Sequence, residues 1–150
     1  SIERDLQVNF FMIPALELLQ VHRTQAGARL FLDNSTEDIQ FTGSQVLEDE
    51  VSLGYVSQVP ERFVSVTVFF DRDSDSITLV HVLISPGMRS RALRLIDASY
   101  STNLFADHTG TGQVHLLGIH DLDGVGIQIT LREQESDLGP LLSINYSFSN

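Results

Sequence analysis

The sequence predicts an all-β protein, an antiparallel β-sandwich or jelly roll of about nine or ten strands with at most one short helix. Two observations support this class. In most of the apolar segments, every second residue is apolar, and a period of two residues is typical of a strand. Turn residues separate these segments at short intervals, so the helices of ten residues or more that an α/β fold needs have no room.

The clearest strands are FVSVTVFF (63–70) and ITLVHVLIS (77–85), which the polar hexapeptide DRDSDS joins. Val66 and Val68 alternate with Ser65 and Thr67, as in a strand. Because both faces of this hairpin are largely apolar, we expect it at the middle of a sheet, covered on both sides.

Weaker alternation predicts further strands before this hairpin, and turn residues delimit them. The expected strands are residues 6–13, 27–32, 39–42 and 51–59. Residues 15–23 fit either a strand or a helix, and we favour a strand because the alternation continues to His22. Gly43 is expected to end the third of these strands, and Gly54 to mark a bulge in the fourth.

After the hairpin, residues 89–98 fit either an alternating strand or one short helix. Strands are predicted at 113–119, 125–131 and 142–148. The pair Asp123-Gly124 predicts a tight hairpin between the first two, because both central positions of such a turn need positive φ.

The size and composition indicate one domain, residues 1–150, with 42% hydrophobic residues to build a core. The chain begins at Ser1, and we interpret it as a processed product or an excised part of a larger protein. The absence of cysteine excludes thiol chemistry and cysteine-ligated metals.

The chain has nine arginines, no lysine and a net charge of −11. The missing lysine excludes Schiff-base chemistry. The negative charge argues against nucleic-acid partners and anionic membranes. The most apolar segment, residues 10–19, contains Pro14 and Glu17 and is too short to cross a membrane, so no membrane insertion is expected.

A calcium site is one hypothesis for the tip of the central hairpin. Asp71, Asp73 and Asp75 alternate there and together offer several carboxylate oxygens, which calcium prefers. The calcium-loop pattern needs Gly at its sixth position and a carboxylate at its twelfth, where this chain has Ser76 and Val82. The alternative is a solvated turn that Asp and Ser stabilise by local hydrogen bonds.

A transition-metal site is a second hypothesis, because imidazoles and carboxylates gather in one stretch. Its residues are Asp107, His108, His115, His120, Asp121 and Asp123. His115 and His120 are an odd number of positions apart, so they share a face only if a bulge, for example at Gly118, intervenes. The alternative is a set of exposed histidines at strand ends and loops.

Arg89, Arg91 and Arg94 hold a third of the basic charge within six residues. In an acidic chain they form a counter-patch that fits an acidic partner or another copy. If the segment is a strand, alternation places Arg89 and Arg91 on one face. The alternative is ion pairing within the chain on an edge strand, which also protects that edge.

Enzymatic and glycan-binding sites have weaker support. The chain contains no G-x-S-x-G nucleophile motif. Sugar-binding sandwiches commonly stack sugar rings on Trp or Tyr, and this chain has no Trp and three tyrosines, Tyr55, Tyr100 and Tyr146. Tyr146 alternates with core-type residues, which favours a buried position.

By elimination and by analogy of fold, we predict a non-enzymatic structural or interaction domain. Coat, appendage, fibre-head and adhesion subunits are of this kind, which favours an extracellular or particle-surface location. Its expected partner is itself or another protein. The alternatives are a ligand- or glycan-binding module that uses calcium at the Asp71–Asp75 tip, and a small β-barrel enzyme with a carboxylate or histidine site.

Overall fold

The computed structural model describes residues 18–19, 21–34, 39–57, 65–100, 115–121, 125–137 and 139–148. Seven strands, two α-helices and one 3₁₀ turn have defined bounds within these ranges. The strands are β1 (Ile39–Val46), β2 (Glu50–Ser57), β3 (Ser65–Asp71), β4 (Ile77–Ile84), β5 (His115–Asp121), β6 (Val125–Gln134) and β7 (Leu141–Phe148). The helical elements are α2 (Gln25–Asp33), η1 (Pro86–Met88) and α3 (Arg89–Tyr100).

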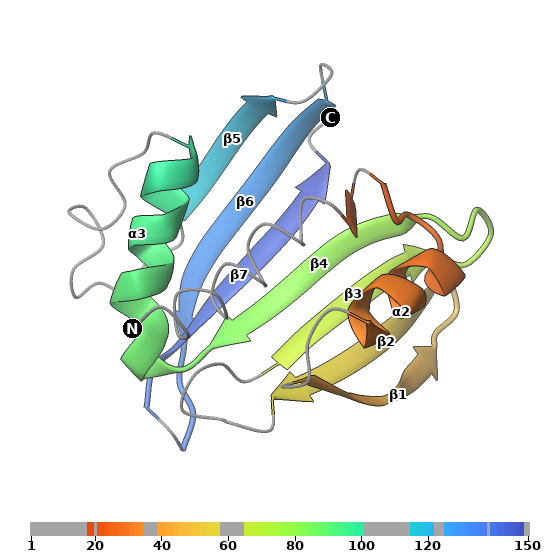
Figure 1. Cartoon of the computed structure of the whole chain (residues 1–150), viewed down its shortest axis with the longest axis horizontal. Helices are drawn as coiled ribbons and strands as arrows, with labels where there is room; N and C mark the ends of the chain where they lie inside the picture. The colour runs from red at the N-terminus through yellow and green to blue at the C-terminus, as the bar shows by residue number, and fades with distance from the viewer. Residues whose placement is uncertain are drawn as a thin grey trace.

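All seven strands belong to one antiparallel sheet with the order β1-β2-β3-β4-β7-β6-β5 (Figure 1). The prediction of a mostly antiparallel β protein is therefore confirmed. The predicted position of the central hairpin is also confirmed, since β3 and β4 pair directly and β4 is the middle strand. The expected cover on both faces is not found among the described residues, because β3 is buried on one face and only half-buried on the other. The described residues form this one sheet, and the second sheet of a sandwich is not found among them.

The hydrophobic core lies between one face of the sheet and the helices (Figure 1). Alternate residues of the strands supply the sheet side, as in β3, where Val66, Val68 and Phe70 are buried. Ala28 and Leu32 of α2 join the same cluster. Alternation along the strands thus predicts the buried face correctly, because successive side chains point to opposite faces.

The predicted strand at residues 27–32 is wrong, because this segment lies within α2. The Thr24 side chain accepts a hydrogen bond from the Gly27 amide at the start of the helix. The buried residues Ala28 and Leu32 are four positions apart, which places both on the face that meets the sheet. The favoured strand at 15–23 also fails at Leu18 and Leu19, which are buried with helical backbone.

The second departure is α3, a 12-residue helix where the sequence left strand and helix open. Pro86 is near the start of the 3₁₀ turn that leads into it, a position that Pro tolerates. Met88 and Ala92, four residues apart, are buried against the core. With α2 and α3 both present, the prediction of at most one short helix is wrong.

Strand β1 continues beyond Gly43, where the sequence predicted its end. The register between β1 and β2 shifts between Phe41 and Gly43, so the bulge lies in β1 and not at Gly54 in β2. Gly43 adopts a φ of 139°, a conformation that other residues rarely adopt. The predicted bulge is thus close in space to the real one, since Gly54 pairs with Gly43.

Candidate functional site

Strand β1 forms one edge of the sheet, pairing with β2 on one side only among the described residues. An edge strand presents backbone N–H and C=O groups that another strand can pair with. Proteins usually block such an edge with charged residues or proline, and the β1 sequence IQFTGSQV contains neither. The bulge between Phe41 and Gly43 is the one protecting feature of β1 that the register shows.

Exposed apolar side chains gather in the segments around this edge. Val46 ends β1 and Leu47 follows it, and Leu30 lies on α2, which packs beside β1. These residues and Val21, which precedes α2, are the large hydrophobic residues of the described part of the chain that are exposed. Leu30 is the most exposed of the four, at 67%.

A hollow of about 280 Å³ lies between α2 and β1, on the face of the sheet that the helices cover. Its lining comprises Gln25, Ala26, Arg29, Phe41, Ser44 and Leu53. Arg29 is the only charged residue in this lining. The hollow therefore combines apolar side chains, Ala26, Phe41 and Leu53, with polar ones and one guanidinium group beside the edge strand β1.

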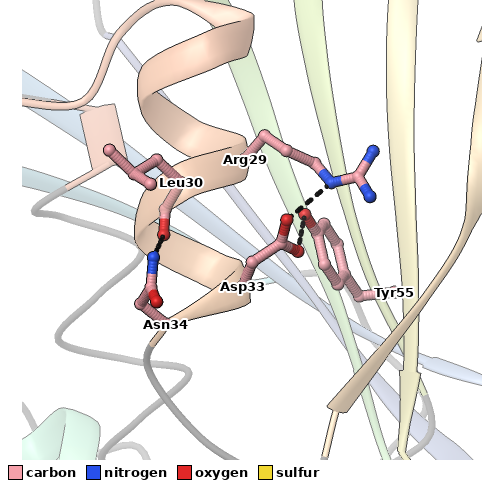
Figure 2. Close-up of polar contacts among 5 residues, drawn as sticks. All are labelled: Arg29, Leu30, Asp33, Asn34 and Tyr55. Atoms are coloured by element: carbon pink, nitrogen blue, oxygen red, sulfur yellow. Dashed lines mark hydrogen bonds and ion pairs between the residues drawn. The ribbon is translucent and has the colours of Figure 1, made fainter.

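The guanidinium of Arg29 contacts Asp33, which Tyr55 contacts in turn (Figure 2), and it also lies over the Phe41 ring. Its Nε donates to a carboxylate oxygen of Asp33 at 2.8 Å, one helical turn away. The hydroxyl of Tyr55 in β2 donates to the other carboxylate oxygen at 3.0 Å. The Cζ atom of Arg29 lies 3.4 Å from the centroid of the Phe41 ring, a cation–π contact. The group is thus held in one orientation without being buried.

The same arrangement changes the ionisation of Tyr55. Burial of the phenol raises the pKa of Tyr55 well above its usual value, and the hydrogen bond to Asp33 and the negative charge of that residue raise it further. Tyr55 is therefore a neutral donor at any physiological pH, and it keeps the Asp33 carboxylate oriented toward Arg29.

The two terminal nitrogens of Arg29 make no hydrogen bond or ion pair with the described residues, because the Asp33 contact uses Nε. Figure 2 shows these nitrogens pointing away from Asp33. A guanidinium binds a carboxylate best through two parallel N–H donors. Arg29 retains such a pair of donors next to β1.

A second hollow, of about 350 Å³, lies on the opposite face of the same strand. Its lining comprises Thr42, Gly43, Ser44, Gln45, Ser52, Gly54 and Thr67. These residues are uncharged, with hydroxyl or amide side chains or none at all. A Cβ atom at Gly54 would lie 2.8 Å from the Thr42 hydroxyl, so a larger residue at this position would clash with Thr42.

At the tip of the central hairpin, two of the three candidate calcium ligands have structural partners. The Asp71 carboxylate accepts hydrogen bonds from the amide and the hydroxyl of Ser74. These bonds lower the pKa of Asp71, with the Ser74 hydroxyl as the larger cause. The Asp75 carboxylate accepts from the amide and the side chain of Gln25, the first residue of α2.

Asp73 is exposed at the same tip. Among the residues that the structure describes, no three His, Asp or Glu side chains lie close enough to hold a metal ion together. Arg72 instead joins this tip to the β1–β2 turn, with its amide donating to the Asp49 carbonyl at 3.0 Å. The turn interpretation thus accounts for the contacts of the Asp71 side chain, whereas the Asp75 side chain contacts a residue outside the turn, Gln25.

The predicted arginine patch lies on a helix and not on a strand. Arg89, Arg91 and Arg94 all belong to α3, where residues three apart share a face and residues two apart do not. We expected Arg89 and Arg91 on one face if the segment were a strand, and this does not hold for a helix. Arg91 and Arg94, which are three residues apart, share a face of α3 instead. Arg89 forms an ion pair with Glu133 of β6 at 2.8 Å, with both side chains largely buried.

The predicted histidine cluster is only partly within the described residues, since Asp107, His108 and Asp123 lie outside them. The register between β5 and β6 runs without a shift from His115 to Asp121. The bulge at Gly118 that a common face for His115 and His120 requires is therefore not present.

Sequence reasoning did not identify the group of Arg29, Asp33 and Tyr55. The signal was the spacing of Arg29 and Asp33, which are four residues apart and form an ion pair only on a helix. It also did not identify the contact of His81 with Ser143, in which the His81 Nε2 lies 2.9 Å from the Ser143 hydroxyl.

Comparisons of the chain with protein-family models, with curated proteins and with solved structures find no match. None of the described helices is long and apolar enough to span a membrane.

Proposed function

We propose that this chain is a protein-interaction domain that binds an extended segment of a partner protein as an additional strand alongside β1. In this mode of recognition, backbone hydrogen bonds supply affinity and hollows for alternate side chains supply specificity. The proposal keeps the expected class, a non-enzymatic interaction domain, and assigns the contact to an edge of the sheet.

The observation that carries the proposal is the pair of hollows on the two faces of β1. Ser44 lines both of them. Side chains of an added strand alternate between the two faces of the sheet, so successive residues of a bound segment would enter one hollow and then the other. β1 contains no charged residue and no proline, which favours such pairing along the side that no described strand occupies.

The experiment uses peptides as long as β1, which has eight residues. Binders are selected from a random display library against the folded domain and then synthesised. Amide hydrogen exchange, measured with and without peptide, should show slower exchange within Ile39–Val46. The second edge strand, His115–Asp121, serves as the internal control and should not change.

N-methylation of the peptide tests backbone pairing directly. In a strand, alternate N–H groups point to opposite sides, so only one alternating set can pair with β1. Methylating that set should abolish binding, while methylating the other set should not. Tolerance of both sets, protection at β5 in place of β1, or failure to select any binder would each contradict the proposed function.

A further inference from the structure

We propose that the segment added to β1 carries a carboxylate, which the two terminal nitrogens of Arg29 bind. This inference rests on the proposed function and names the chemistry of its partner. The partner segment is otherwise uncharged where it lies along β1, and its acidic group is an Asp or Glu side chain or a terminal carboxylate.

Arg29 is already oriented before any partner binds. The Nε–Asp33 ion pair and the Phe41 ring fix the plane of the guanidinium, and Tyr55 in turn orients Asp33. A side chain that is already ordered loses little conformational freedom when it binds.

Arg29 lines the hollow that lies along β1 on the helix-covered face, together with Phe41 and Ser44 of β1 itself. Every second side chain of an added strand would point to that face. A carboxylate at one of these positions would reach the two terminal nitrogens of Arg29, and the intervening side chains would meet the hydroxyl-lined hollow on the opposite face.

The composition of β1 favours a partner segment over a second copy of this chain. β1 contains no acidic residue, so a second β1 paired with the first would bring no carboxylate of its own to Arg29. Two copies would also repel each other, because each carries a net charge of −11. A segment with a single carboxylate avoids most of this repulsion.

The test compares each selected peptide with a counterpart in which its acidic residue is replaced by the matching amide. We expect an Asp or Glu to recur among the binders. The amide counterpart should bind the wild-type domain at least about tenfold more weakly, as a charge-assisted bidentate contact predicts. Against Arg29→Gln the two peptides should bind equally. Arg94→Gln, which removes an exposed arginine from α3, is the charge-matched control and should retain the difference.

Since Arg29→Gln also removes the ion pair with Asp33, its melting temperature must be measured. Ser44→Phe is the second variant, because its larger side chain would fill the hollow between α2 and β1 and leave Arg29 and Asp33 unchanged. It should weaken binding of the acidic peptide if the hollow receives a side chain.

The outcomes separate the two proposals. Peptides that protect β1 yet show no preference for a carboxylate would overturn this inference and leave the proposed function standing. No binding at β1 would overturn both. A stable dimer of the free domain with β1 already protected would identify a second copy as the occupant, and would also overturn the carboxylate partner.

Discussion

At the scale of single residues, the structure is most informative where a polar group has a defined partner. Arg29, Asp33 and Tyr55 form one chain of contacts from α2 to β2, and this chain controls both the orientation of a cation and the ionisation of a phenol. His81 of β4, which contacts Ser143 of the neighbouring strand β7, is a second such group. The shifted pKa values of Tyr55 and His81 lead to predictions about how stability depends on pH.

Tyr55 should resist ionisation in alkaline solution. Its pKa in the folded state is raised above the ordinary value of 10.0, so the unfolded chain loses this proton first. Stability is therefore fully present below about pH 10 and falls as the pH rises above it. Absorbance titration of tyrosinate, compared between the wild type and Tyr55→Phe, should show that Tyr55 ionises late. Asp33→Asn should lower the pKa of that tyrosine, and an unchanged titration would contradict the contact.

His81 should make the fold sensitive to mild acid. Burial lowers the pKa of His81, and the positive charge of Arg132 lowers it further. The folded state therefore disfavours the charged imidazole, and stability present above the ordinary pKa of 6.5 is lost as the pH falls below it. Melting temperatures measured between about pH 8 and about pH 5 should fall for the wild type and less steeply for His81→Gln. Parallel curves would assign the acid sensitivity to other groups.

At the scale of elements, the contacts at helix ends and turns decide what the polar residues do. The DRDSDS turn has the composition of a cation-binding loop, yet Asp71 stabilises the turn itself and Asp75 binds the first residue of α2. A contact between segments 50 residues apart is not visible in local sequence.

Replacing Asp75 by Ala should destabilise the fold, because the Gln25 amide and side chain lose their acceptor. We expect a loss of about 1 kcal/mol in urea unfolding. Asp73→Ala, at an exposed neighbouring position, is the matched control and should change stability little. Repeating both measurements with calcium tests the alternative function. A calcium-induced rise in melting temperature that either variant removes would revive the metal site.

At the scale of the whole molecule, one antiparallel sheet carries helices on one face and leaves β1 at an edge (Figure 1). The ion pair of Arg89 with Glu133 links α3 to β6 on the side of the sheet far from β1. It therefore supports the attachment of a helix, whereas the alternative interpretation of the arginine patch expected ion pairing on an edge strand.

Arg89→Ala should accordingly lower the free energy of unfolding by about 1–3 kcal/mol, since it leaves Glu133 largely buried without this partner. Arg94→Ala, at an exposed position of the same helix, should have a smaller effect. A double-mutant cycle with Glu133→Gln measures the pairwise energy. Equal effects of the two arginine substitutions would argue against a structural role for Arg89.

The sequence by itself determined the strands around the central hairpin and at the C-terminus. In β3 a long alternating pattern gives both the strand and its buried face. In β7 the pattern gives the strand, but Leu141 and Ser143 are buried along with the alternating residues Leu142, Ile144 and Tyr146. Segment 27–32 is too short for its pattern to distinguish a strand from a helix. Ala28 and Leu32 lie on one face in either structure, because they are four residues apart. Packing against the sheet and the Thr24 cap decided for helix.

Only the tertiary structure decided the candidate site. The order of the strands makes β1 an edge, and no local pattern encodes that order because it depends on pairings across the whole sheet. The same folding brings Arg29 of α2 over Phe41 of β1 and Asp33 to Tyr55 of β2. Contacts between elements depend on their relative positions, and so the chemistry beside β1 appears only once the chain is folded.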